Sequence, residues 1–190
     1  MSELKKVYDI LLSSPNDVEK ERELVTRNIE EINLLVNKFF NVGVRLIKWE
    51  TNSHSTIGDS AQEIITQQFG SNFDIYVGIM GMRLGTPTKN SLSGTVDEFN
   101  HAHDIYLKNK SAFDIKFYFS DVEIRPSTIN IEQYEMVREF KTKIQKLGVY
   151  TSDYNSYDKF ARKIRIDIMH KIYDFVGLDR IQPSIIETKI

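Results

Sequence analysis

The sequence of 190 residues contains no cysteine. This absence excludes a disulfide framework, a cysteine-ligated zinc site, an iron–sulfur cluster and a thiol nucleophile. The sequence also lacks a run of roughly 20 apolar residues, the length that a membrane-spanning helix needs. Its first six residues (MSELKK) are mostly polar or charged, and no apolar signal-peptide core follows them. We therefore expect a cytoplasmic protein that does not enter a membrane.

An excess of charge of either sign is missing as well. Lysine and arginine number 25, aspartate and glutamate 27, and the net charge is -2. Nothing in this balance attracts DNA, RNA or an anionic membrane, and the mildly basic segment 159–180 is typical of a solvated helix face. Hydrophobic residues make up 41%, enough for a sizeable core. We expect a single domain over residues 1–180, followed over 181–190 by a flexible tail or a linker to a partner or a further domain.

Several common functional motifs are absent. The glycines of segment 78–88 are not followed by the Gly-Lys-Ser/Thr ending of a phosphate-binding P-loop. No GxGxxG follows the first apolar run, and no GxSxG nucleophile elbow is present. His101 and His103 are two positions apart, so on a helix they point to different sides. We expect no metal site.

Short apolar runs alternate with amphipathic segments along the chain. The apolar runs predict strands at residues 7–12, 44–49, 73–80 and 115–119, with a short fifth strand at 149–150. Helices are predicted at about 15–36, 59–69, 95–107, 131–147 and 157–175, the first with Ser14 as N-cap and Pro15 in the first turn. This alternation predicts an α/β fold, with a parallel sheet of four to five strands and helices on both faces.

In such a sheet, ligands bind beyond the carboxyl ends of the strands. Loops 13–17, 50–59 and 81–98 are therefore the expected walls of a site. In the last loop, small residues precede a helix start, where backbone N–H groups can hold a phosphate or a ribose hydroxyl. Glu98 is expected in the first turn, and such a carboxylate can stabilise the oxocarbenium-like state of glycosyl cleavage. An acidic residue there is equally ordinary as a partner of the helix dipole, so Glu98 alone leaves both interpretations open.

Several sequence blocks together resemble a TIR-like family, whose members often stand at the N-terminus of large NTPase or repeat proteins. The resemblance covers roughly residues 7–175. The blocks that carry it are Ile10 to Val18 (ILLSSPNDV) with Glu21-Arg22, Trp49-Glu50, Asp74 to Met80, Arg83 to Thr88, and Ser93-Gly94-Thr95 followed by Asp97-Glu98-Phe99 and Ala102.

The resemblance implies a flavodoxin-like (TIR-like) three-layer sandwich, which nucleoside 2-deoxyribosyltransferases share. Enzymatic TIR domains cleave NAD+ at the nicotinamide–ribose bond, and Glu98 matches their catalytic glutamate. NAD+ is then a substrate, and no cofactor is implied. The residues implied or expected to bind the substrate are Ser13, Ser14, Trp49, Arg83, Gly85, Thr86, Ser93, Gly94 and Thr95.

Some of these residues have a physical case of their own. Arg83 is placed near the pyrophosphate, with which an arginine can pair in bidentate fashion, although a surface ion pair is an equal alternative. Trp49 could stack on a base or belong to the core or rim. Asp17 and Arg22 are interpreted as structural, Asp17 as a helix cap.

Three functions compete. The first is an NAD+ nucleosidase, an assembly-activated effector of bacterial anti-phage defence or abortive infection, working as a homo-oligomer or with a sensor protein. The second is a non-catalytic TIR-like module that binds copies of itself or a partner, favoured by the apolar segment 157–175 and the isoleucines of the tail. The third is a nucleoside or nucleotide N-glycosidase of the deoxyribosyltransferase type, with Glu98 as nucleophile. Glu98→Gln should abolish the two activities and spare assembly.

Overall fold

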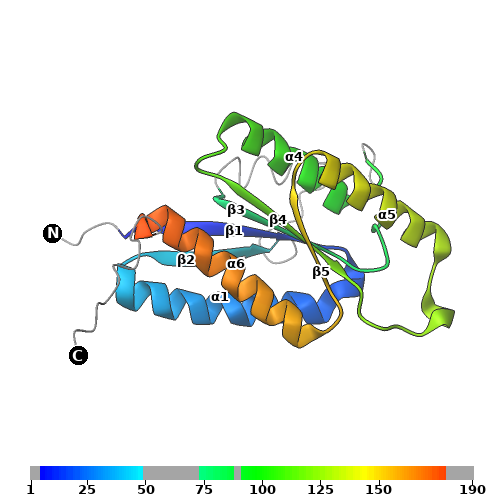
Figure 1. Ribbon diagram of the computed structural model, residues 1–190, viewed down its shortest axis with the longest axis horizontal. Helices are drawn as coiled ribbons and strands as arrows, with labels where there is room; N and C mark the ends of the chain where they lie inside the picture. The colour runs from blue at the N-terminus through cyan, green and yellow to red at the C-terminus, as the bar shows by residue number, and fades with distance from the viewer. Residues whose placement is uncertain (1–4, 49–72, 88–90, 179–190) are drawn as a thin grey trace, which may run out of the picture.

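In the computed structural model, five parallel strands form one twisted sheet in the order β2-β1-β3-β4-β5 (Figure 1). The structure describes residues 5–48, 73–87 and 91–178. The strands are β1 (Val7–Ser13), β2 (Gly43–Lys48), β3 (Ile75–Met80), β4 (Asp114–Ser120) and β5 (Tyr150–Tyr154). The α/β class and the flavodoxin-like topology are thereby confirmed.

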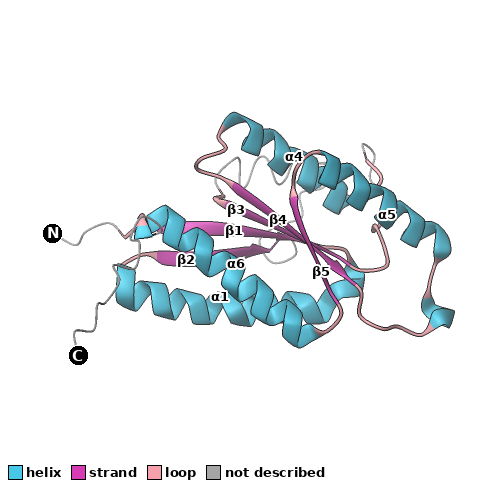
Figure 2. Ribbon diagram, viewed as in Figure 1, coloured by secondary structure: helices cyan, strands magenta, loops and turns pink. Residues whose placement is uncertain are grey.

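Four helices of the described residues cover the two faces of the sheet (Figures 1 and 2). The helices α1 (Glu19–Phe40) and α6 (Tyr157–Val176) lie on one face, and α4 (Gly94–Lys108) and α5 (Ile131–Lys146) lie on the other. Successive side chains of a strand point to opposite faces, so Ile10 and Leu12 pack beneath α1 and α6 while Leu11 packs beneath α4 and α5. Both faces are covered, which explains why all six residues of β3 are buried.

The apolar side chains of α6 fill the core. Phe160, Ile164, Ile168 and Ile172 are completely buried among residues of β1, β3, β4 and α1. The apolar character of segment 157–175 therefore reflects packing inside the domain, and it no longer argues for a partner surface. The tail at 181–190 lies outside the described residues.

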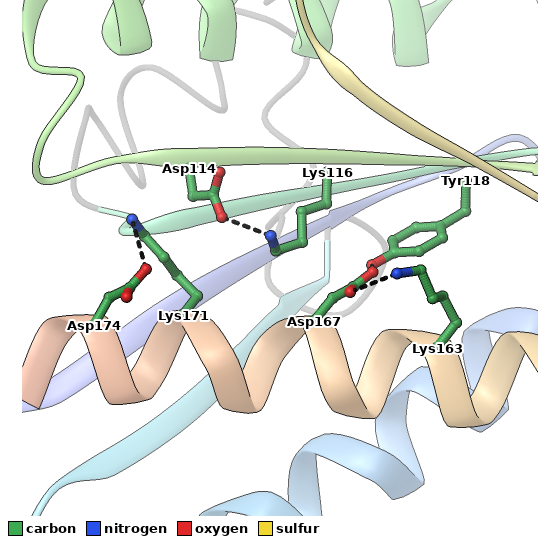
Figure 3. Close-up of polar contacts among 7 residues, drawn as sticks. All are labelled: Asp114, Lys116, Tyr118, Lys163, Asp167, Lys171 and Asp174. Atoms are coloured by element: carbon green, nitrogen blue, oxygen red, sulfur yellow. Dashed lines mark hydrogen bonds and ion pairs between the residues drawn. The ribbon is translucent and has the colours of Figure 1, made fainter. Parts of the chain in front are cut away.

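Polar contacts also join α6 to the sheet (Figure 3). The Tyr118 hydroxyl on β4 donates to Asp167 Oδ2 at 2.8 Å, and Lys163 Nζ lies 3.0 Å from Asp167 Oδ1. Burial and the charge of Asp167 raise the pKa of Tyr118 well above its ordinary value, so the phenol stays a neutral donor. Because both oxygens of this buried carboxylate have partners, the cluster binds α6 to β4 without leaving a stranded charge.

The start of the first helix differs from the prediction. Residues Asn16–Val18 form a 3-10 turn, η1, and Pro15 rather than Ser14 occupies its N-cap position. Helix α1 begins only at Glu19, and no side chain caps it. The prediction that Ser14 and Asp17 cap this helix was therefore wrong. The predicted helix at 59–69, the loop 50–59 and Trp49 lie outside the described residues.

Candidate functional site

The carboxyl ends of β1 and β3 meet the first half of α4 at one edge of the sheet. Ser13 ends β1 with its side chain 1% exposed, and Glu98 of α4 is 9% exposed. The hydroxyl of Ser13 lies close enough to Glu98 to lower the pKa of that carboxyl, but burial raises it more, and the charge of Asp97 adds to the rise. The pKa of Glu98 is thereby raised to about 7. A carboxyl group that titrates near neutrality inside a cleft is a candidate for chemistry.

Glu98 lies one residue beyond the first turn of α4, because the helix begins at Gly94 rather than at the predicted Thr95. The Ser93 hydroxyl caps the helix by accepting a hydrogen bond from the Val96 N–H at 3.2 Å. Asp97 is the acidic residue of the first turn and is the one that complements the helix dipole. The acidic side chain that interacts with the dipole of α4 is therefore that of Asp97 and not that of Glu98.

Two cavities adjoin Glu98, and Glu98 and Ser14 line both of them. The first cavity has a volume of about 440 Å³ and is also lined by Ser13, Lys48 and residues of α1. The residues of α1 are Glu19, Arg22, Glu23, Thr26, Arg27 and Glu30. The second has a volume of about 740 Å³ and opens over the start of α4. Its walls include Ser14, Arg83, Gly85, Thr86, Ser93, Gly94, Thr95 and Glu98.

Every residue predicted for the site that the structure describes thus lines one or both of these cavities. Ser13 contributes to the first cavity only. Its Oγ is buried and, within the described part of the chain, forms no hydrogen bond of ordinary geometry. The hydroxyl nevertheless lies close enough to Glu98 to lower the pKa of that carboxyl, so Ser13 belongs with Glu98 in the lining of the first cavity. Trp49, the remaining predicted residue, lies outside the described residues.

The loop after β3 is held by side chains that the sequence did not single out for this task. Asp17 Oδ2 accepts hydrogen bonds from the backbone N–H groups of Met82 and Arg83 at 2.9 and 3.1 Å. Gln133 Oε1 of α5 accepts one from the Leu84 N–H at 3.0 Å. Asp17 and Gln133 also line the second cavity. Asp17 therefore lies in the site and holds the loop after β3 in place. The sequence indicated this only through its position in loop 13–17, one of the three loops expected at this edge.

Arg22 has the structural role predicted for it, because its Nη1 donates to the Pro15 carbonyl at 2.9 Å and braces the loop between β1 and α1.

The described helices include none that is long and apolar enough to cross a bilayer. In the same residues, no three or more histidine, aspartate and glutamate side chains are grouped so that they could hold a metal ion.

Comparison with known proteins adds a family. The family model described as "Domain of unknown function (DUF4062)" matches residues 9–169. No curated protein matches the chain. Among solved structures, two crystal structures of homoserine dehydrogenase from S. aureus, at pH 6.5 and pH 6.0, are similar over 80% and 79% of this chain, with 15% and 14% identity and a TM-score of 0.37 each. The chain spans about a third (33%) of that enzyme, and similarity at this level carries no argument about function.

Proposed function

The chain belongs to the DUF4062 family, and we propose that it is an NAD+ nucleosidase that cleaves the nicotinamide–ribose bond at Glu98. One observation carries the proposal: a buried carboxyl group with a pKa of about 7 lies between two cavities at the carboxyl edge of the sheet. The resemblance of the sequence blocks around Ser13, Arg83 and Glu98 to the TIR-like family supports NAD+ as the substrate.

The chemistry requires little more than this carboxylate. The bond between the nicotinamide nitrogen and C1′ of the ribose breaks, and its electron pair neutralises the pyridinium ring, which leaves as nicotinamide. Positive charge develops on C1′ and the ring oxygen, and an ionised Glu98 beside the ribose stabilises that charge. Water then forms a bond to C1′ and loses a proton to the solvent. Because the ionised carboxylate is the active form, kcat/KM should rise with pH through about 7.

The two cavities suit the two parts of the substrate. Arg83 and the first residues of α4, Gly94 and Thr95, line the second cavity, and an arginine and a helix N-terminus are both suited to phosphate oxygens. That cavity, at about 740 Å³, is the larger and is assigned the ADP-ribose part. The first cavity, at about 440 Å³, is assigned the smaller nicotinamide. The scissile bond then lies beside Glu98, which both cavities share.

We further infer from the resemblance that the protein is an assembly-activated effector in anti-phage defence, acting as a homo-oligomer or with a sensor protein. The experiment measures nicotinamide release from NAD+ by the purified chain at low and high protein concentration, with products separated by chromatography. We expect release per molecule to increase with concentration. A parallel incubation with 2′-deoxynucleosides tests the deoxyribosyltransferase alternative.

The outcomes distinguish the three functions. Nicotinamide release by assembled protein supports the proposal. Base release from deoxynucleosides alone would replace it with the N-glycosidase that uses Glu98 as nucleophile. Assembly without turnover of either substrate would refute both activities and leave the binding module.

A further inference from the structure

We propose that Asp17 and Gln133 are positioning residues that hold the Arg83 loop in its binding shape before any ligand arrives. The loop meant here is the segment 81–85, which follows β3. Only the nature of the ligand rests on the proposed function. The two side chains and the backbone N–H groups that they hold form a clamp, which depends on hydrogen bonds, steric contacts and the topology of the sheet and on no ligand.

The first half of the clamp comes from the loop between β1 and α1. A single oxygen of Asp17 accepts from two successive backbone N–H groups, those of Met82 and Arg83. Hydrogen bonds to an ionised carboxylate are stronger than those between neutral groups. Burial raises the pKa of Asp17 above its ordinary value, and the two N–H groups and the nearby Arg83 guanidinium oppose that rise because they favour the ionised form.

The second half comes from the opposite side, on α5. Gln133 Oε1 accepts from the next N–H along the loop, that of Leu84, at 3.0 Å. The Leu84 side chain is completely buried in the core beneath α4 and α5. Three consecutive N–H groups of the loop are therefore satisfied by side chains of two separate elements. A loop bonded in this way takes its shape from the elements that hold it.

Two glycines permit this arrangement. A Cβ at Gly81 would lie 2.6 Å from Asp17 Oδ2 and 2.9 Å from Val18 Cγ1, distances that real Cβ atoms essentially never show. At the other end of the loop, the backbone of Gly85 has a φ of +108°, a conformation that residues other than glycine rarely adopt. The close approach of Asp17 to the loop is thus possible only with glycine at position 81.

The clamp has a consequence for binding. Arg83 carries the middle one of the three clamped N–H groups, and this residue lines the second cavity. A loop that is already ordered loses less conformational entropy when a phosphate binds. Because the phosphates are remote from the breaking bond, Arg83 should bind the ground state and the transition state equally. Loss of the clamp should then raise KM and leave kcat unchanged.

The first test needs no activity. Amide hydrogen exchange of the ligand-free protein is followed by NMR for the wild type, Asp17→Ala, Asp17→Asn, Gln133→Ala and the control Gln145→Ala. The control removes a hydrogen bond to Thr151 from the exposed side of the same helix, α5. We expect Asp17→Ala to accelerate exchange at Met82 and Arg83 about tenfold or more, a change equivalent to one hydrogen bond.

Asp17→Asn keeps an oxygen that can accept both bonds but loses the charge that strengthens them, so exchange at Met82 and Arg83 should lie between the wild type and Asp17→Ala. Gln133→Ala should accelerate exchange at Leu84, and Gln145→Ala should leave all three amides unchanged. Unchanged exchange at Met82 and Arg83 in Asp17→Ala, in a protein whose β1 and β3 amides stay protected, overturns the proposal. If Asp17→Ala does not fold, exchange at Leu84 in Gln133→Ala decides in the same way.

The second test uses NAD+ turnover. Asp17→Ala should raise KM about tenfold with kcat within about twofold, and combining it with Arg83→Ala should raise KM little beyond Arg83→Ala alone. A fall in kcat at unchanged KM would contradict positioning through Arg83. A wild type that does not release nicotinamide refutes the proposed function, while the exchange rates still decide whether the clamp exists.

Discussion

Replacing Glu98 with glutamine should change how the stability of the protein depends on pH. The pKa of this carboxyl is about 7 in the folded protein, against an ordinary value of 4.5, chiefly because it is buried. Between these two pH values the folded state keeps a proton that the unfolded chain has released. The free energy of unfolding therefore falls as pH rises through this window, and above about 7 the contribution is constant.

The size of the effect follows from the same two values. The slope is about 1.4 kcal/mol for each pH unit between 4.5 and 7, which gives a total of about 3 kcal/mol. Glutamine does not titrate, so the variant loses this dependence and keeps only a pH-independent difference from the wild type. Relative to the wild type, Glu98→Gln should gain about 2 to 3 kcal/mol between pH 5 and pH 8.

Urea unfolding of both proteins at pH 5 and pH 8 measures this gain. Asp17 and Asp74, whose pKa values burial also raises, are present in both proteins and cancel in the comparison. The matched control is Glu139→Gln, which makes the same change of charge at an exposed position of α5 outside both cavities. A stability difference between wild type and Glu98→Gln that is equal at the two pH values would contradict the raised pKa of the buried Glu98 carboxyl.

Three further predictions concern the core, and urea unfolding at neutral pH measures each. Tyr118→Phe removes the 2.8 Å hydrogen bond to the buried Asp167 and should lower the free energy of unfolding by about 1 to 3 kcal/mol; an unchanged value would mean that water replaces the phenol. Ile164→Ala truncates a completely buried side chain of α6 and should lower the free energy of unfolding by about 2 to 5 kcal/mol. Ile166→Ala, at a position of the same helix that is 41% exposed, should lower it clearly less. Gly78→Ala would place a Cβ 2.3 Å from Phe117 Cε2 in the core and should lower it by about 1 to 3 kcal/mol; a neutral result would show that the ring moves aside freely.

Much of the fold could be predicted because the inner strands are buried on both faces. The segment 73–80 is apolar apart from Asp74, a pattern with few other interpretations, and β3 lies within it. The last strand was predicted at 149–150 only, whereas β5 spans Tyr150–Tyr154. Its middle residues, Thr151, Ser152 and Asp153, are polar because β5 lies at the edge of the sheet, so hydrophobicity does not reveal them.

The start of the first helix shows how tertiary contacts override a local pattern. Ser14 and Pro15 have the sequence of an ordinary helix start. In the folded chain this segment forms a 3-10 turn, and the Asp17 carboxylate binds N–H groups 65 and 66 residues further along. No local signal indicates that preference, because it depends on the position of the loop after β3.

The edge of the sheet at which the candidate residues lie could be predicted, whereas the arrangement of the cavities there could not. The sheet topology brings the ends of β1 and β3 to one edge, so residues predicted from loops 13–17 and 81–98 meet there. The division into two cavities that share Glu98 depends on the shape of α1 and α4 and is not encoded in any motif. Gln133 was missed because its contact with Leu84 joins positions 49 residues apart.

The proposed role of Glu98 in NAD+ cleavage is tested by comparing three forms of the protein. Nicotinamide release is measured for the wild type, Glu98→Gln and Glu139→Gln, each at the same high protein concentration and at pH 8, where Glu98 is ionised in the free protein. We expect equal release by the wild type and Glu139→Gln and a loss of at least about a hundredfold in Glu98→Gln, in the range of removing one electrostatic stabiliser of a transition state. Release by Glu98→Gln at the wild-type rate, or none from the assembled wild type, would contradict the proposed role.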